Sequence, residues 1–349
     1  MKKTRSDEAP LPPACHSTNK PFENGKKPRA HSQLLSLLGR RFCLGLLTLL
    51  ALSAVVFAST QILPGDVASA VLGRDATEEA LRAFRQTLGL DQPALLRYFS
   101  WLSNALHGDF GLSLANGAPI IDQIRFRLEN TLLLAAVAAI ISIPLAVILG
   151  IVSAIKSQGR VGSFLNISAL AAISIPEFLF GYLLILVFST QLGWFSAISM
   201  VLPGMDLTQR LSVVILPAFT LAPMVWAYTM RMTRTAVLSV MSQPYIEMAI
   251  LKGEPRSSIV LRQALPNAMA PLISVVALNL AYLIVGVIVV ETIFVYPGIG
   301  QYMVDAVGKR DIPTVQACGL IFGATYVLIN LLADLLVIIT NPRLRGALK

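Results

Sequence analysis

Six long runs of apolar residues, separated by more polar segments, recur along the chain. Each run is near the roughly 20 residues that a helix needs to cross a bilayer, and exceeds the roughly ten-residue alternating strands of membrane barrels. Because a spanning segment must pair its own backbone groups, we expect helices. The runs are approximately 42–63, 131–155, 164–190, 211–230, 271–295 and 316–340. The pattern predicts an all-α integral membrane protein with six transmembrane helices.

Lysine and arginine gather in segments that flank these runs. The N-terminal segment ends in Arg40 and Arg41, a short loop carries Lys156 and Arg160, and two more basic segments lie within 231–262 and 343–349. In a six-span arrangement all four segments fall on one side of the membrane. The positive-inside rule makes that side the cytoplasm and predicts that both termini are cytoplasmic, whereas an odd number of spans would place one basic end outside.

The spans divide the chain into five parts. Residues 1–41 are basic and rich in proline and small polar residues, which predicts a disordered cytoplasmic tail. Residues 42–63 form the first transmembrane helix, since this run lies too far from the N-terminus to be a cleaved signal peptide. We expect a periplasmic segment at 64–130, a core of five helices at 131–340 with a cytoplasmic loop at about 244–266, and a cytoplasmic C-terminus at 341–349.

Composition excludes several other classes of protein. With 55% hydrophobic and 13% charged residues, the chain is more apolar than most water-soluble domains. The net charge of +9 does not indicate a nucleic-acid partner, because the basic residues lie at the ends of apolar runs and do not interleave with aromatics. The three cysteines and three histidines are scattered, so neither a disulfide framework nor a metal site is expected.

Four prolines interrupt the predicted spans. They are Pro144, Pro176, Pro217 and Pro223. Each removes a backbone donor, so we expect each to kink its helix. Such breaks often line a pathway in transport proteins, but a kink absorbed by packing against a neighbouring helix fits each proline equally well.

Three acidic residues fall within or near the ends of the spans: Glu177, Glu291 and Asp334. An ionisable group at membrane depth is costly and is a functional candidate by default. A proton-coupled transporter would need one of them to titrate and often shows an inverted repeat, which this sequence lacks. Structural pairing, for example of Asp334 with Asn330 or a cytoplasmic arginine, is therefore the expected role.

The loop between the fourth and fifth spans carries the most informative pattern. Polar and apolar residues alternate at helical spacing from Pro244, and the stretch 253–255, Gly-Glu-Pro, predicts the end of a first short helix. Residues 258–264 favour a second short helix, and we expect Pro266 to break the chain again.

This loop resembles the cytoplasmic loop of the membrane subunits of bacterial binding-protein-dependent ABC importers. Their pattern is Glu-Ala-Ala, three residues, Gly, nine residues, Ile, any residue, Leu-Pro. The chain matches it at Glu247, Ala249, Gly253, Leu265 and Pro266. It departs from the pattern at two positions, Met248 and Gln263.

The likeness to the peptide, nickel and opine branch of this family extends over roughly nine-tenths of the chain. It is carried by short stretches in the right order, at 63–66, 88–93, 108–113, 291–294, 297–300 and 310–313, and by the C-terminal stretch 341–345. Within the branch, the chain resembles the first of the two dipeptide and oligopeptide permease subunits. The resemblance implies the ABC importer type I permease fold in a bacterial inner membrane.

The resemblance also implies a function and partners. The chain would be a permease subunit working with a second homologous permease, two ABC ATPase subunits and a periplasmic solute-binding protein, and Glu247 would help to dock the loop on an ATPase. The sequence has no phosphate-binding loop, so we expect it to bind no cofactor and ATP-Mg to sit on the partners. Substrates would be peptides or relatives such as opines, glutathione or nickel complexes. A stand-alone secondary transporter or channel, or an intramembrane enzyme, is the competing interpretation.

Overall fold

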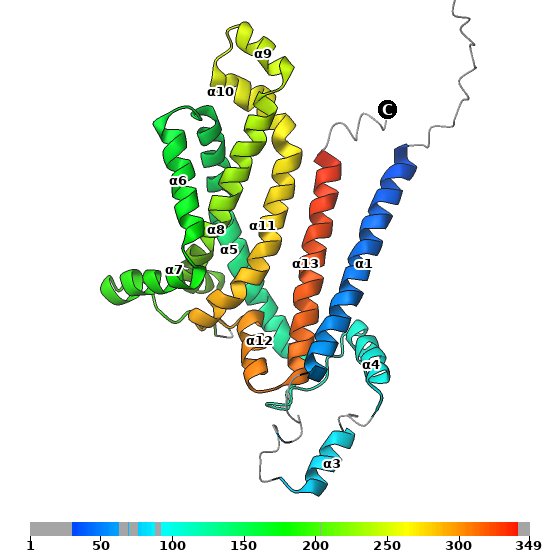
Figure 1. The fold of residues 1–349 in the computed structure, drawn as a ribbon. Helices are drawn as coiled ribbons and strands as arrows, with labels where there is room; N and C mark the ends of the chain where they lie inside the picture. The colour runs from blue at the N-terminus through cyan, green and yellow to red at the C-terminus, as the bar shows by residue number, and fades with distance from the viewer. Residues whose placement is uncertain (1–29, 63–68, 70–75, 88–91, 203, 341–349) are drawn as a thin grey trace, which may run out of the picture.

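The computed structural model describes residues 30–62, 69, 76–87, 92–202 and 204–340. Helices dominate this part of the chain, and the longest ones lie side by side with their axes roughly parallel (Figure 1). The elements are α1 (Ala30–Ile62), α3 (Glu78–Thr87), α4 (Ala94–Leu106), α5 (Ile120–Ile155), α6 (Arg160–Ser174), α7 (Glu177–Leu184), the π-helix η1 (Ile185–Gln191), α8 (Leu207–Met241), α9 (Pro244–Leu251), α10 (Arg256–Ser258), the π-helix η2 (Ile259–Ala264), α11 (Leu265–Ile293), α12 (Ile299–Gly308) and α13 (Ile312–Thr340).

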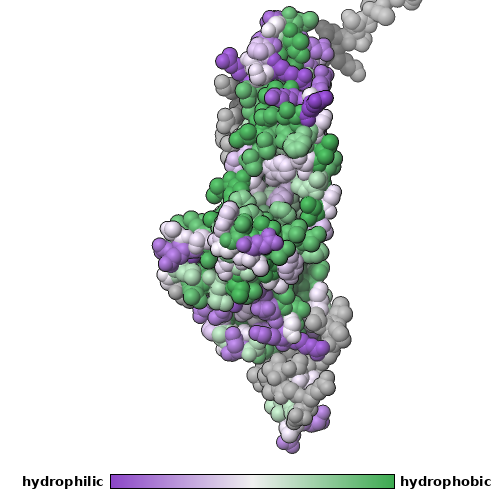
Figure 2. All heavy atoms as spheres, turned by 90° about the vertical axis from the view of Figure 1, so that its left-hand side faces the viewer, coloured by the Kyte–Doolittle hydropathy of each residue, from purple (hydrophilic) through white to green (hydrophobic). Residues whose placement is uncertain are grey.

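Five of these segments are long and apolar enough to cross a membrane, and a bent pair supplies a sixth. The five lie at Gly39–Gln61, Ile120–Ile155, Leu207–Met241, Arg256–Ile284 and Ile312–Val337. Figure 2 shows a broad hydrophobic band across the middle of one face, with hydrophilic residues mostly toward the two ends. The predicted all-α membrane fold is confirmed for the residues that the structure describes.

The third predicted span, 164–190, is not one straight helix. It consists of α6, followed by α7 and η1, and the two parts are bent by 95°. The bend falls at Ile175 and Pro176, whose ψ angles of 122° and 135° are extended. Proline lacks a backbone donor and disfavours the helical conformation in the residue before it, so two successive residues leave the helix here. The other three prolines, Pro144, Pro217 and Pro223, remain inside α5 and α8.

Several helices begin earlier than the apolar runs predicted. Helix α1 starts at Ala30, inside the predicted tail, since the leucine-rich stretch 33–38 has high helix propensity. Helix α5 starts at Ile120, and its first turns carry charged residues that hydropathy alone would assign to a loop. The predicted tail at 1–29, the C-terminus at 341–349, and most of the family-like stretches 63–66 and 88–93 lie outside the described residues.

Helix α1 packs along α13 at the edge of the bundle (Figure 1). A Cβ atom at Gly323 would overlap the side chain of Leu52, so glycine allows the two helices to approach closely. Gln316 donates to Thr60 Oγ1 over 2.7 Å toward the outer end. At the inner end Arg41 and Asp334 form an ion pair of 2.9 Å. The predicted pairing of Asp334 with a cytoplasmic arginine is therefore present, and its partner is Arg41.

Glu291 ties the outer ends of α5, α11 and α12 together. Its fully buried carboxylate accepts hydrogen bonds from Thr131 Oγ1 over 2.6 Å and from the backbone N–H of Gln301 over 3.0 Å. The adjoining Gly298 has no room for a Cβ atom, which would overlap this carboxylate. The family-like stretch 291–300 thus forms a hydrogen-bonded corner, and the predicted structural pairing of Glu291 is observed.

A second buried carboxylate, Asp311, fastens the segment before α5 to the start of α13. It accepts hydrogen bonds from the hydroxyls of Ser113 and Thr314, and from the backbone N–H of Leu114 over 3.1 Å. Two family-like stretches that are far apart in the sequence, 108–113 and 310–313, therefore meet in space. Both buried carboxylates fix connections at the end of the molecule opposite α9 (Figure 1).

Candidate functional site

The predicted cytoplasmic loop folds into α9, α10 and η2 at one end of the long helices (Figure 1). Pro244 occupies the first turn of α9, where a missing backbone donor costs nothing, and Gln243 before it is extended, with ψ of 146°. Glu247 lies in the first turn of α9, where a negative charge is favoured by the helix dipole. The first short helix of the sequence-based prediction is therefore present.

Gly253 ends α9 in a left-handed turn. Its φ is +79°, and its N–H donates to the carbonyl of Ile250 over 2.9 Å. The N–H of Glu254 reaches back to Ala249 O over 3.2 Å, so the two bonds together form a Schellman motif. A Cβ atom at Gly253 would meet nothing within 4 Å. Glycine is favoured here by backbone conformation and not by lack of space.

One face of α9 is buried against η2. Ile246 and Ala249 form a small apolar cluster with Ile259, and Met241 packs at its edge. Ala249 is 5% exposed and points into the loop. Its small side chain therefore permits the close approach of α9 to η2, which is a role within the loop itself.

The opposite face of α9 is exposed and largely apolar. Met248 is 58% exposed and Leu251 is 80% exposed, and Tyr245 and Ile250 are also exposed. Glu247 lies among them, exposed and without a hydrogen bond or ion pair to any other described side chain. Apolar side chains gathered on a helix that projects from the end of a membrane protein are typical of a protein contact surface.

Three side-chain hydrogen bonds brace this loop. Gln263 donates to Glu254 Oε2 over 2.9 Å, across the turn that Gly253 makes. Asn267 at the start of α11 donates to the hydroxyl of Tyr245 over 3.2 Å. Arg256 donates over 2.8 Å to a serine hydroxyl in the connection between α5 and α6. Helix α9 is thus fixed to its neighbours on more than one side.

Pro266 does not break the chain as the sequence predicted. Helix α11 begins at Leu265 and includes Pro266 in its first turn, directly after η2. In an α-helix the proline ring would clash with the carbonyl four residues earlier, that of Arg262. The wider π-helical turns of η2 end just before this proline and change the register of the helix. The loop therefore continues into the fifth span as one helical unit.

The five residues of the sequence motif occupy different places in this loop. Glu247 is exposed, Ala249 is buried against η2, Gly253 forms the turn, and Leu265 and Pro266 open α11. The sequence did not predict the three side-chain hydrogen bonds that stabilise this loop, because Gln263 is notable in the sequence only as a departure from the family pattern. Among the described residues no group of three or more His, Cys, Asp or Glu side chains is placed to hold a metal ion.

Comparison with known proteins places these features in a family. Residues 146–346 match the model of the "binding-protein-dependent transport system inner membrane component". Residues 34–135 match the N-terminal model of the same kind of membrane component. The glutathione transport system permease protein GsiC of Escherichia coli K12 is 37% identical over 303 residues, which cover 86% of this chain and 96% of that protein. The proteins of the same description from Shigella dysenteriae and Shigella flexneri show the same identity and coverage.

These matches decide between the competing interpretations of the sequence. A family model that covers the core of the chain and long relatives at 37% identity argue against a stand-alone secondary transporter, a channel or an intramembrane enzyme. The chain belongs to the family of inner membrane components of binding-protein-dependent transport systems, the permease subunits of ABC importers.

Proposed function

We propose that this permease imports peptides or related small solutes, glutathione among them, and that α9 couples its movement to ATP hydrolysis on separate subunits. The relatives that are 37% identical are described as glutathione transport permeases, which supports this class of solute. In this proposal the chain encloses half of the pathway, a second homologous permease encloses the other half, and an external solute-binding protein delivers the substrate.

The exposed apolar face of α9 is the observation that carries the coupling proposal. Leu251 and Met248 are exposed on α9, which lies at the end of the molecule (Figure 1), so they contact no other part of the described chain extensively. Two ATPase subunits hold ATP-Mg in this proposal, and a groove on one of them would cover the exposed face of α9. Glu247 would pair with a basic group at the rim of that groove.

The braces around α9 explain how a displacement there could reach the membrane. Helix α9 packs on η2, and η2 continues directly into α11. Val260 and Ala264 of η2 also pack against residues of α5 and α8, including Ala154 and Val237. Helix η2 passes into α11 without a break. A displacement of α9 would therefore move α5, α8 and α11 together.

The opposite end of the molecule is the proposed contact for the solute-binding protein. Helix α3 lies beyond the ends of α1 and α13, and α4 lies beside the end of α1 (Figure 1). Local bracing of α1 by α4 is also supported, since Tyr98 of α4 and Ser53 of α1 lie within hydrogen-bond distance at 2.8 Å. The two roles are compatible, because α3 lies further out than α4.

Replacing one exposed leucine on α9, and one on α4 as a control, tests the coupling proposal. Leu251 on α9 and Leu106 on α4 are both 80% exposed, so they form a matched pair. Leu251→Asp should prevent co-purification of the ATPase subunits and abolish ATP-dependent uptake in reconstituted vesicles. Leu106→Asp should leave ATPase binding unchanged. Normal ATPase binding by Leu251→Asp would contradict the assignment of this face.

A further inference from the structure

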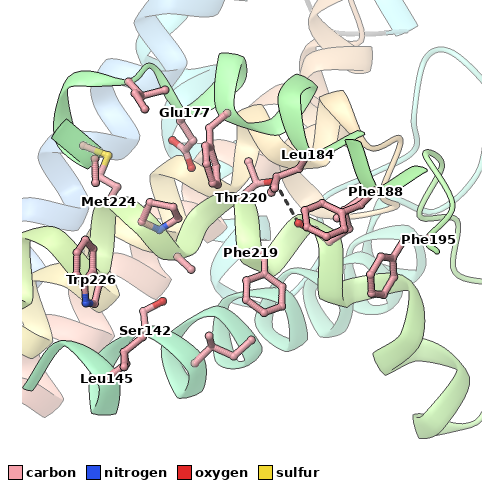
Figure 3. A pocket seen from close by; sticks show the side chains of 17 residues that line it. Ser142, Leu145, Glu177, Leu184, Phe188, Phe195, Phe219, Thr220, Met224 and Trp226 are labelled. Atoms are coloured by element: carbon pink, nitrogen blue, oxygen red, sulfur yellow. Dashed lines mark hydrogen bonds between the residues drawn. The ribbon is translucent and has the colours of Figure 1, made fainter. Parts of the chain in front are cut away.

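A cavity of about 560 Å³ lies between α5, α7, η1 and α8, beside the bend of the third span (Figure 3). Its walls are almost entirely apolar and include several aromatic rings. Phe180, Phe188, Phe195, Phe219 and Trp226 contribute the rings. A volume between about 300 and 1,000 Å³ with a few polar groups suits a small organic molecule.

Glu177 is the one acidic or basic side chain among the residues that line this cavity. Figure 3 shows its carboxyl group directed toward the space between the helices. The carboxylate also lies against α11, where a Cβ atom at Gly286 would be 3.2 Å from Oε1 and 3.4 Å from Oε2. Glycine at 286 therefore leaves room for this group. No hydrogen bond or ion pair joins it to another described residue, in contrast to Glu291 and Asp334.

The depth of Glu177 makes an unpaired carboxylate costly. Helix α6 has 15 residues and starts from the cytoplasmic side at Arg160, so it rises by ~22 Å before the bend. The hydrocarbon core of a bilayer is about 30 Å thick, so Glu177 lies within it. Acidic residues at such depth almost always face a partner, a bundle interior or a water-filled path. The dipole of the short helix α7 favours a charge in its first turn, but it does not account for the aromatic cavity beside it.

Two tyrosines extend the polar surface next to Glu177. Tyr282, one turn from Gly286 on α11, has both Glu177 and Tyr228 of α8 as electrostatic neighbours. Tyr282 is 43% exposed and Tyr228 is 47% exposed. Asn279, almost one turn further along α11, donates to Thr229 Oγ1 over 3.1 Å. Polar groups thus follow one another along α8 and α11, and the exposure of Tyr228 and Tyr282 among them is more consistent with an aqueous path than with lipid.

We propose that this cavity is a binding site for an organic ammonium group, supplied by the transported solute as it passes the bend. The carboxylate of Glu177 would pair with the ammonium, and the aromatic rings that line the same cavity, those of Phe219 and Trp226 among them, would attract its positive charge. A peptide with a free amino terminus carries such a group. As a statement about the substrate, this inference rests on the proposed function, whereas the cation site itself can be measured without transport.

Binding of a small probe to the purified importer tests the site first. Phenethylammonium and its neutral analogue 2-phenylethanol have the same ring, and the binding of each can be measured by equilibrium dialysis against the purified importer. We expect saturable binding of the ammonium, about tenfold or more weaker in Glu177→Gln, because a charge-assisted hydrogen bond is lost. Binding of the alcohol should not change. Equal losses for both probes would overturn the proposal.

Two further variants distinguish a loss of the binding site from a loss of folding. Phe219→Leu should weaken phenethylammonium binding by several-fold while Glu177 is intact, through loss of a cation–π contact. Phe164→Leu changes a ring that is 69% exposed on α6 and does not line the cavity, so it should bind the probe normally. Normal binding by Phe219→Leu, or weak binding by Phe164→Leu, would contradict the assigned position.

Uptake then separates the site from the proposed function. In vesicles that hold the whole importer, Glu177→Gln should slow ATP-dependent uptake of glutathione by about tenfold, with ATPase subunits still bound. Lost probe binding with unchanged uptake would overturn the substrate role of the cavity. Failure of the unaltered importer to take up glutathione, with probe binding that depends on Glu177, would refute the proposed substrate and leave the cation site standing.

Discussion

Replacement of Gly253 gives a prediction whose magnitude follows from the backbone. Gly253 has φ of +79°, and a Cβ atom placed there would have open space around it, so the cost of a side chain is conformational and not steric. An L-residue in the left-handed region costs about 1–2 kcal/mol, and part of this is offset because alanine also restricts the unfolded chain. We therefore expect Gly253→Ala to weaken the ordered form of α9 by about 1 kcal/mol.

This cost should appear in the affinity for the ATPase subunits. Because 1.4 kcal/mol corresponds to tenfold in an equilibrium constant, a penalty of about 1 kcal/mol predicts a Kd about fivefold weaker for Gly253→Ala. Valine should be worse, since β-branched residues are genuine outliers at positive φ. Asparagine, which tolerates this region, should be close to glycine. The assay is titration of detergent-purified permease complex with the ATPase subunit, followed by ATP-dependent uptake for each variant.

A matched glycine provides the control for this series. A Cβ atom at Gly308, at the end of α12, would also meet nothing within 4 Å, but the φ of this glycine is not positive. Gly308→Ala should leave ATPase affinity unchanged. The reasoning would be refuted if Gly253→Val bound the ATPase normally, or if asparagine at 253 were as harmful as valine.

Three further predictions concern the contacts that hold the helices together. Glu291→Gln should lower the free energy of unfolding by about 1–3 kcal/mol, because the oxygen of the new amide cannot accept from both buried donors. The control Asp305→Asn, on the exposed side of α12, should change the free energy of unfolding little. Thermal unfolding in detergent measures both. Gly298→Ala should be at least as destabilising in the same assay, since its Cβ atom would displace the Glu291 carboxylate, and a normal Tm would show that this corner is not tightly packed. A double-mutant cycle on Arg41 and Asp334 should give a coupling of only about 0.2–1 kcal/mol, because both side chains are partly exposed, and a much larger value would point to a desolvated pair.

The sequence by itself determined the class of the protein and the point where α9 ends. Runs of about 20 apolar residues have few alternatives to a spanning helix, because backbone groups cannot remain unpaired in lipid. The stretch 253–255 likewise predicted the end of α9, since glycine suits the residue after a helix. These are local preferences, which act through each residue's own backbone.

Only the tertiary structure decided which polar residues meet and which way each face points. Glu291 and Thr131 are 160 positions apart, and Ser113 and Asp311 are 198 positions apart, so no local pattern could pair them. Pro176 predicted a kink, but the 95° bend that sets Glu177 at an apolar cavity depends on how α7 packs against α8 and α11. A local rule fixes where a helix stops, whereas burial and hydrogen bonding between distant segments fix what its side chains contact.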